Sequence, residues 1–211
     1  FISEMSSIIK KTGAAMEKTL FRTAIQSIYF DMQRILKHYT NRTNGDYQKN
    51  AIDTFIEVQV LMLTPFTPHI CEEIWQAIGK ERMISISDWP TYDEANIDEK
   101  LERGEQYVSE IISDVRTVKE LAKLDRVSEI NIFIAEPWRY EFFDIVRKEI
   151  ASGNRDFKAI LGKLMVNEDI KKQGKVVTKM LPMLLKKGLP TNVSRKQELE
   201  VLKESVETIE S

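Results

Sequence analysis

Residues able to carry out catalysis are few in this sequence. It contains two histidines, His38 and His69, and a single cysteine, Cys71. They do not supply the nucleophile, histidine and acid on which covalent catalysis depends. His69 and Cys71 lie two positions apart on a predicted helix and therefore point in different directions, which suits a shared metal ion poorly. We expect no catalytic residue and no metal ligand in this chain.

Patterns that bind cofactors are also missing from the sequence. No stretch matches the glycine-rich G-x-G-x-x-G pattern or the P-loop, both of which hold phosphate groups. Paired carboxylates such as Glu72-Glu73 lie in polar surroundings, and catalysis by two carboxylates needs environments that separate their pKa values. We expect this chain to bind no cofactor and to catalyse no reaction by itself.

Basic side chains, by contrast, gather in one long segment. No acidic residue occurs between Ile170 and Gln197, although the whole chain has a net charge of −2. Lysines at helical spacing predict a charged face opposite an apolar stripe with Val176, Met180 and Leu184. Such a face is typical of a surface that binds a phosphate backbone, but also of a solvated helix, and both interpretations stay open. The candidate phosphate contacts in this segment are Lys171, Lys172, Lys175, Lys179, Lys186, Lys187, Arg195 and Lys196.

A second basic group comes much earlier in the chain. Arg34, Lys37 and Arg42 lie with His38 near the end of a predicted helix and could face solvent together. Basic residues at this end of a helix also complement its dipole, so a purely local role is an alternative. We expect these three residues to be further phosphate contacts.

The elements that position the earlier group form a predicted helical bundle. Residues 2–12 are expected to be helical, with an end near Gly13. Apolar residues recur every three or four positions over 14–39 and 47–63, and Thr67-Pro68 is a good start for a further helix. Short loops between helices of this length favour antiparallel packing. The alternating segment 83–87 is expected to be extended. We assign residues 1–90 to this bundle.

The rest of the chain, 91–211, is predicted to be a small mixed α/β extension. Its one clear strand is expected near 129–135, where β-branched residues are bounded by polar ones. Helices are expected over 98–123, from Pro137 to about Gly153, and over 154–165, 167–187 and 194–210. The fold class is therefore mainly α, a bundle followed by an α/β extension.

Composition sets limits on the class of protein. The 211 residues are 42% hydrophobic and 30% charged, values that indicate a folded globular chain. No apolar run approaches the roughly 20 residues needed to cross a bilayer, so we expect no membrane partner. A single cysteine and no signal peptide favour a cytoplasmic location. A start at Phe1 without Met suggests a piece of something longer.

One segment carries a family resemblance. Residues 64–75, TPFTPHICEEIW, resemble the PFxPHxxEExW segment of class I aminoacyl-tRNA synthetases that act on leucine, isoleucine or valine. Phe21-Arg22-Thr23-Ala24 is similar to the FRxAL helix of the same family, and the segment ending at Trp89-Pro90 also fits. The resemblance implies that residues 1–90 are a helical anticodon-binding domain.

The second half narrows the resemblance. Residues 104–115, 137–143 and 164–175 resemble the region after the bundle in archaeal-type leucyl-tRNA synthetases. The resemblance implies a C-terminal fragment that docks tRNA, with tRNA-Leu as partner. It implies a parent enzyme that uses ATP and Mg²⁺ in catalytic and editing domains absent from this chain. The alternatives are the equivalent region of an isoleucyl or valyl enzyme and a helical protein-interaction module.

Overall fold

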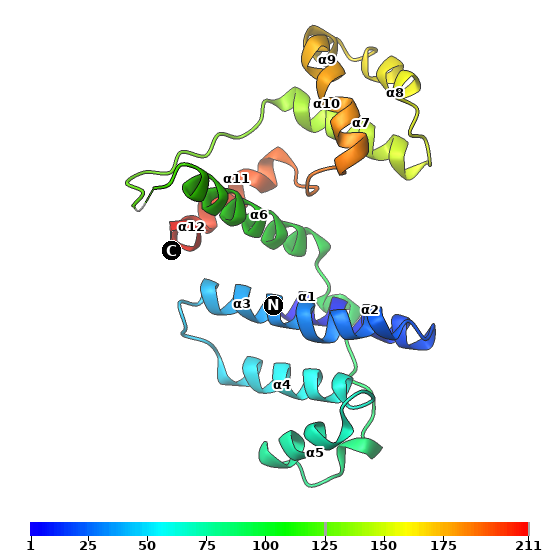
Figure 1. Ribbon diagram of the computed structural model, residues 1–211, viewed down its shortest axis with the longest axis vertical. Coiled ribbons are helices and arrows are strands. Elements are labelled where there is room, and N and C mark those ends of the chain that lie inside the picture. Colours follow the sequence, from blue (N-terminus) through cyan, green and yellow to red (C-terminus); the bar gives the residue numbers. More distant parts are fainter. Residues whose placement is uncertain (125, 211) are drawn as a thin grey trace. The chain divides into compact units, whose positions relative to one another are not determined.

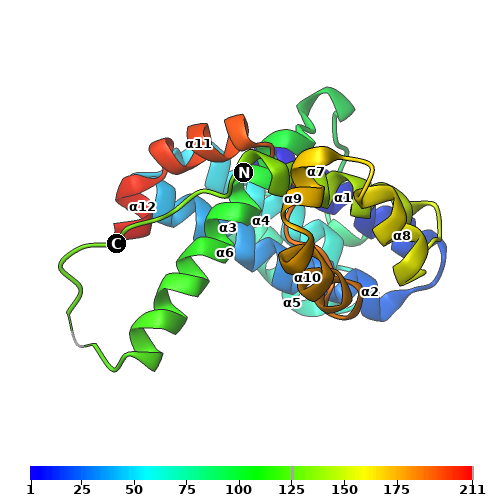
Figure 2. The same ribbon diagram turned by 90° about the horizontal axis from the view of Figure 1, so that it is seen from above.

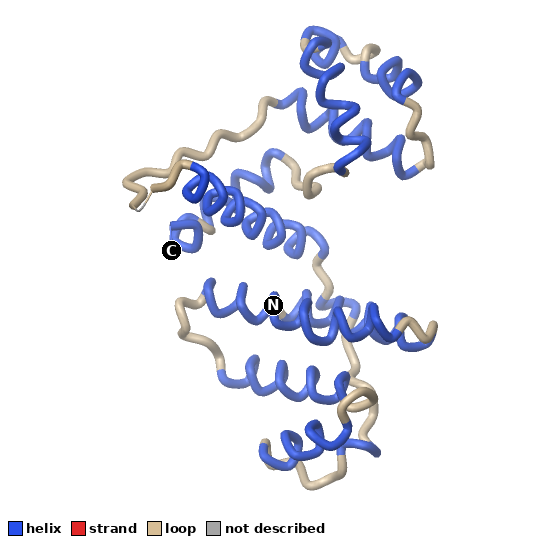
Figure 3. Tube along the Cα trace, viewed as in Figure 1, coloured by secondary structure: helices blue, strands red, loops and turns tan. Residues whose placement is uncertain are grey.

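The computed structural model describes residues 1–124 and 126–210, and its described elements are helices joined by loops (Figure 3). The chain divides into two compact units, Phe1–Glu105 and Gln106–Ile209. The division falls inside α6 (Glu99–Leu121), whereas the sequence predicted a domain boundary after residue 90. Each unit has its own apolar core, so each is described separately.

The first unit is a bundle of helices (Figure 1). It contains α1 (Ile2–Glu17), α2 (Phe21–Ile25), a π-helical turn (Gln26–Asp31), α3 (Met32–Arg42), α4 (Lys49–Leu63) and α5 (Pro68–Ala77). Within Figure 1, α4 lies between α3 and α5. Two 3₁₀ turns, Ile84–Ile86 and Glu94–Asn96, then lead to α6. The bundle predicted from the helical periodicity is confirmed.

The core of the bundle comes from the apolar stripes of these helices. Ile28, Met32 and Ile35 are fully buried and pack with Phe55 and Met62 of α4. A smaller cluster formed by Val60, Cys71, Trp75 and Ile84 joins α4 to α5 and to the first 3₁₀ turn. Burial of these side chains is what holds short helices together.

Two local predictions for the bundle were wrong. The first helix does not stop near Gly13 but continues to Glu17, and the turn into α2 is made by Thr19 with φ 56°. The segment 83–87 is not extended throughout, because Ile84–Ile86 form a 3₁₀ turn whose Ile84 side chain is buried. In both places packing of apolar side chains overrides the local sequence signal.

The second unit is also helical in its described part. After α6 it contains α7 (Pro137–Ala151), α8 (Phe157–Leu164), α9 (Glu168–Lys172), α10 (Gly174–Lys187), α11 (Arg195–Glu204) and α12 (Val206–Glu210). Its core includes Phe142 and Val146 of α7, Ile160 of α8, Ile170 of α9 and Leu181 of α10. Helices α7 to α10 therefore enclose one common core.

The strand predicted near 129–135 is not formed. These residues run as an extended loop between α6 and α7, without strand pairing to any described residue (Figure 2). A strand exists only with a partner that completes its hydrogen-bond ladder, and the described residues offer none. The part of the second unit that the structure describes is helical and not mixed α/β.

Candidate nucleic-acid interface

The basic face of α10 is the clearest candidate surface in the structure. Lys175, Lys179 and Lys186 are all exposed on this helix. At about 100° per residue they fall within an arc of about 40°, on the side opposite the buried Val177, Leu181 and Leu184. They span about 16 Å along the helix axis at 1.5 Å per residue. We call these three lysines the α10 lysine face.

The lysine spacing predicted the exposed side of α10, but the buried stripe was misjudged by one position. The single helix expected over 167–187 is also wrong, because the structure divides it into α9 and α10 and leaves Lys172 on α9. Val177 is fully buried, whereas its neighbour Val176 is exposed and Met180 is only half-buried. Leu184 is buried as expected. The anchoring of α10 through Val177, Leu181 and Leu184 turns the lysines outward.

The lysines of the face are not paired with carboxylates in the described part of the chain. The structure shows no ion pair for Lys175, Lys179 or Lys186 with any described acidic residue. This follows from the sequence, because the segment that surrounds them lacks acids. Their positive charge is available to a partner from outside the unit.

The other candidates in the basic segment differ from the α10 lysine face. Lys172 forms an ion pair with Asp169 at 2.8 Å, and Lys196 lies 3.8 Å from Glu200. Lys171 and Lys187 are exposed on the ends of α9 and α10. Because exposed ion pairs are weak, a phosphate could still compete for Lys172 and Lys196.

The early basic group is largely engaged within the first unit. The guanidinium of Arg42 contacts both carboxylate oxygens of Glu105, Nη2 at 2.5 Å and Nε at 3.2 Å. Both side chains are mostly covered, with 27% and 17% of their surfaces exposed. Arg34 Nη1 lies 3.6 Å from the buried carboxylate of Glu4. Lys37 is exposed, and no ion pair with a described residue involves it.

His38 adds no charge to this group at neutral pH. Burial lowers the pKa of its imidazole below the ordinary value, and the nearby Arg34 lowers that pKa further. Its Nδ1 atom is buried and has no hydrogen-bond partner among the described residues. Lys37 is therefore the only member of the early group that is both exposed and unpaired within the described residues.

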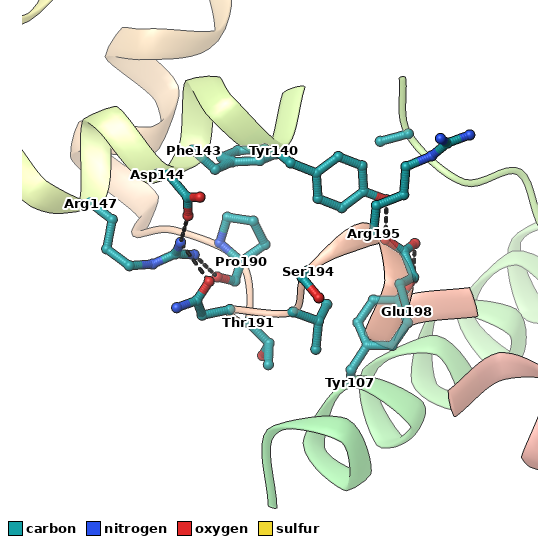
Figure 4. A pocket seen from close by; sticks show the side chains of 13 residues that line it. Tyr107, Tyr140, Phe143, Asp144, Arg147, Pro190, Thr191, Ser194, Arg195 and Glu198 are labelled. Carbon is teal, nitrogen blue, oxygen red and sulfur yellow. Dashed lines mark hydrogen bonds and ion pairs between the residues drawn. The ribbon is translucent and has the colours of Figure 1, made fainter. Parts of the chain in front are cut away.

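Arg195 lies at a pocket in the second unit (Figure 4). The pocket is lined by α7, by the loop before α11 and by the first turn of α11. At its edge Glu198 is 7% exposed and accepts hydrogen bonds from the hydroxyls of Tyr107, at 2.5 Å, and Tyr140. These contacts join α6, α7 and α11 through one carboxylate.

Several polar groups of this pocket contact one another. Burial raises the pKa of both tyrosine hydroxyls, and hydrogen bonding to the Glu198 carboxylate raises it further, so both stay protonated donors. Arg147 pairs with Asp144 at 3.1 Å and donates to Asn192 Oδ1 at 2.8 Å. These contacts join α6, α7 and the segment that leads into α11 within the second unit.

Sequence reasoning missed this carboxylate. A buried acid cannot be recognised by residue type, because most glutamates are exposed. One local signal was present: Ser194 caps α11 by accepting from Gln197 N at 3.3 Å, which places Glu198 in the first turn. That position is favourable for a negative charge.

Two further findings concern the described residues only. They contain no group of three or more histidine, cysteine, aspartate or glutamate side chains arranged to hold a metal ion. None of the described helices combines the length and the apolar character needed to span a bilayer.

The first unit is a bundle of helices, and the α10 lysine face belongs to the second unit. Residues 1–136 match the family described as the anticodon-binding domain of tRNA ligase. The match covers more than half of the chain, and the chain therefore belongs to this family.

Individual relatives carry the name leucine–tRNA ligase. The chain is 32% identical over 212 residues to the protein of that name from Pyrococcus furiosus, covering 99% of this chain and 21% of the relative. It is 32% identical to the Pyrococcus horikoshii protein with the same coverage, and 28% identical to the Aeropyrum pernix protein, covering 100% of this chain and 22% of the relative. The chain spans about a fifth of the length of the relatives that it matches.

Proposed function

We propose that the chain is the non-catalytic, C-terminal tRNA-docking region of an archaeal-type leucine–tRNA ligase acting in the cytoplasm. The observation that carries the proposal is the family match over residues 1–136, together with leucine–tRNA ligases that align with almost the whole chain. These relatives favour the leucine enzyme over the isoleucine and valine enzymes. In this proposal, leucine activation with ATP and Mg²⁺, and editing, take place in domains outside residues 1–211.

The α10 lysine face is the proposed main contact with tRNA. Its three lysines are exposed, unpaired among the described residues and fixed on one side of a helix whose opposite side is buried. Phosphate contacts of this kind position a nucleic acid without reading its sequence. Lys171, Lys172, Lys187, Arg195 and Lys196 extend the face, and Lys37 supplies a separate contact in the first unit. Arg34 and Arg42 remain candidates, but their present carboxylate partners compete with phosphate.

The test replaces the α10 lysine face by glutamine, K175Q/K179Q/K186Q, and measures binding of the chain to a tRNA-Leu transcript by fluorescence anisotropy. We expect a loss of affinity of about tenfold at low salt. The slope of log K against log salt should fall by about one for each lost phosphate contact.

A matched control removes the same number of positive charges from lysines that do not share a face, and it leaves the α10 lysine face intact. K148Q/K158Q/K203Q alters three exposed lysines on α7, α8 and α11. We expect a much smaller loss of affinity from this control. Equal losses from the two variants would contradict a dedicated lysine face. Protection of the anticodon loop alone in a tRNA footprint would contradict the leucine enzyme.

A further inference from the structure

The extended segment 129–135 has the sequence of a strand but no partner. Ile130, Ile132 and Ile134 alternate with Asn131 and Phe133. The structure shows no backbone–backbone hydrogen bond between these residues and any other described residue. Figures 1 and 2 both show the segment as an open strand-like connection between α6 and α7. Within 130–134 the backbone donors and acceptors are therefore not used in pairing with the described backbone, whereas the backbone of Ala135 has a hydrogen bond with Tyr140.

The side chains of the segment are apolar and unusually exposed. Phe133 is 90% exposed, and Ile130 and Ile132 are 37% and 38% exposed. Ile134 is half-buried. A β-branched, apolar segment with an open edge is normally paired or covered in a folded protein, because it otherwise promotes aggregation. Exposed apolar side chains gathered in this way mark an interaction site.

We propose that 129–135 is a docking edge for a β-strand supplied by the same polypeptide outside residues 1–211. Addition of a strand would satisfy the backbone groups and bury the side chains that now face solvent. The relatives are about five times as long as this chain, so ample polypeptide exists to supply the strand. The extension becomes mixed α/β only when that strand is present.

The charges at the two ends of the segment disfavour a second copy as the partner. Glu129 and Glu136 flank the run and are both exposed. An antiparallel pair of two copies in register would place Glu129 opposite Glu136. A parallel pair in register would place Glu129 beside Glu129 of the second copy, and Glu136 beside Glu136. Like charges directly opposite one another destabilise strand pairing. A different strand avoids this repulsion.

This inference rests on the proposed function in one respect, that the chain is part of a longer polypeptide, but it does not depend on tRNA binding and can fail or succeed independently of it. The test compares hydrogen–deuterium exchange at the amides of 131–134 in the 211-residue chain and in the full-length polypeptide of its gene. We expect rapid exchange in the chain alone. In the full-length protein we expect exchange slowed by at least about 100-fold at the amides that face the added strand, which are every second one. Equally rapid exchange in both would overturn the proposal.

A substitution in the full-length protein shows whether a strand causes the protection. I132P and F133P, made separately, each remove one of two successive amides, and successive amides point to opposite edges of a strand, so one of the two variants removes an amide that the ladder needs. V127P introduces the same residue in the exposed loop outside the segment. The proline that removes the paired amide should restore rapid exchange at the remaining amides of 131–134, whereas V127P should leave their exchange slow. Amides of the buried Phe142 and Leu181 report whether the second unit is still folded. Protection unaffected by either I132P or F133P would mean that something other than a strand covers the segment, and would overturn the proposal.

A separate measurement tests whether a second copy of this chain supplies the partner strand. Sedimentation of the 211-residue chain should show a monomer whose exchange at 131–134 does not depend on protein concentration. A dimer that protects these amides in the chain alone would overturn the proposal in favour of self-pairing.

Discussion

At the scale of single residues, Arg42 shows how a basic side chain in a binding domain can serve the fold. Its guanidinium meets both oxygens of Glu105, which joins the end of α3 to the first turns of α6. Two-point contacts between arginine and a carboxylate are geometrically specific, and lysine cannot reproduce them. Arg42 therefore stabilises the first unit in the structure.

Replacing Arg42 by methionine should lower the free energy of unfolding by about 1–2 kcal/mol, because the half-buried Glu105 carboxylate loses its charged partner. Urea unfolding measures this change. Lys37→Met is the control, and it should change stability by less than about 0.5 kcal/mol, since Lys37 is exposed. Unchanged stability with a tenfold loss of tRNA affinity in Arg42→Met would instead make Arg42 a phosphate contact.

The hydrogen bonds from Tyr107 and Tyr140 to Glu198 should make the stability of the chain depend on pH in the alkaline range. The pKa of each hydroxyl is raised above its ordinary value of 10.0 in the folded protein, mainly by burial. Such a group contributes stability that is fully present below about pH 10 and is lost as the pH rises towards the folded pKa. The unfolding free energy should therefore fall as the pH is raised above 10.

The measurement is urea unfolding between pH 8 and about 11, with Y107F/Y140F for comparison. The wild-type chain should lose stability above about pH 10 more steeply than the double variant, which lacks the two raised groups. Tyr29→Phe removes an exposed hydroxyl and should keep the wild-type slope. Identical slopes for wild type and Y107F/Y140F would contradict this account of Glu198.

At the scale of elements, helix starts were predictable and some helix ends were not. Pro68 and Pro137 each begin a helix as expected, because proline suits the first helical turn. Gly13 did not end α1. It lies within the helix, and a Cβ there would stand 3.7 Å from Trp89 Nε1. A contact between residues so far apart in the chain leaves no signal in the local sequence.

The α10 lysine face was also predictable only in part from the sequence. Spacing alone identified the exposed side of α10, because lysines at intervals of four and seven must share a face. It could not choose between Val176 and Val177 as the buried residue, since both are apolar valines at adjacent positions. The prediction of a strand at 129–135 was wrong for a different reason. A strand needs a partner for its hydrogen bonds, and the residue types of the segment do not show whether a partner is present.

The backbone of the turn between α1 and α2 is strained at Thr19, and a substitution can test this strain. Thr19 has φ 56°, a left-handed conformation that costs a β-branched residue of order 1 kcal/mol or more. Thr19→Gly should therefore raise the free energy of unfolding by up to about 1 kcal/mol, after the entropic cost of glycine in the unfolded chain. Urea unfolding at neutral pH checks the sign.

Thr43→Gly is the matched control, because Thr43 has φ −95° and ends α3 without left-handed strain. This substitution should lower stability or leave it unchanged. A loss of stability in Thr19→Gly as large as that in Thr43→Gly would show that the turn is not strained by its side chain.

At the scale of the whole molecule, charge distribution matters more than net charge. The chain is slightly acidic overall, with 33 acidic against 31 basic residues, a balance that by itself gives no reason to expect nucleic acid. The acids are excluded from 170–197, so a positive field arises locally on the second unit. Binding to a phosphate backbone through such a local field must weaken as salt screens it.

The central claim, that this chain docks tRNA through phosphate contacts, is tested most directly by its affinity for a tRNA-Leu transcript at increasing salt. The account predicts measurable binding at low salt and a linear fall of log K with log salt between about 50 and 200 mM. The slope should correspond to at least three phosphate contacts, one for each lysine of the α10 lysine face. No binding at low salt, or an affinity that does not change across this range, would contradict it.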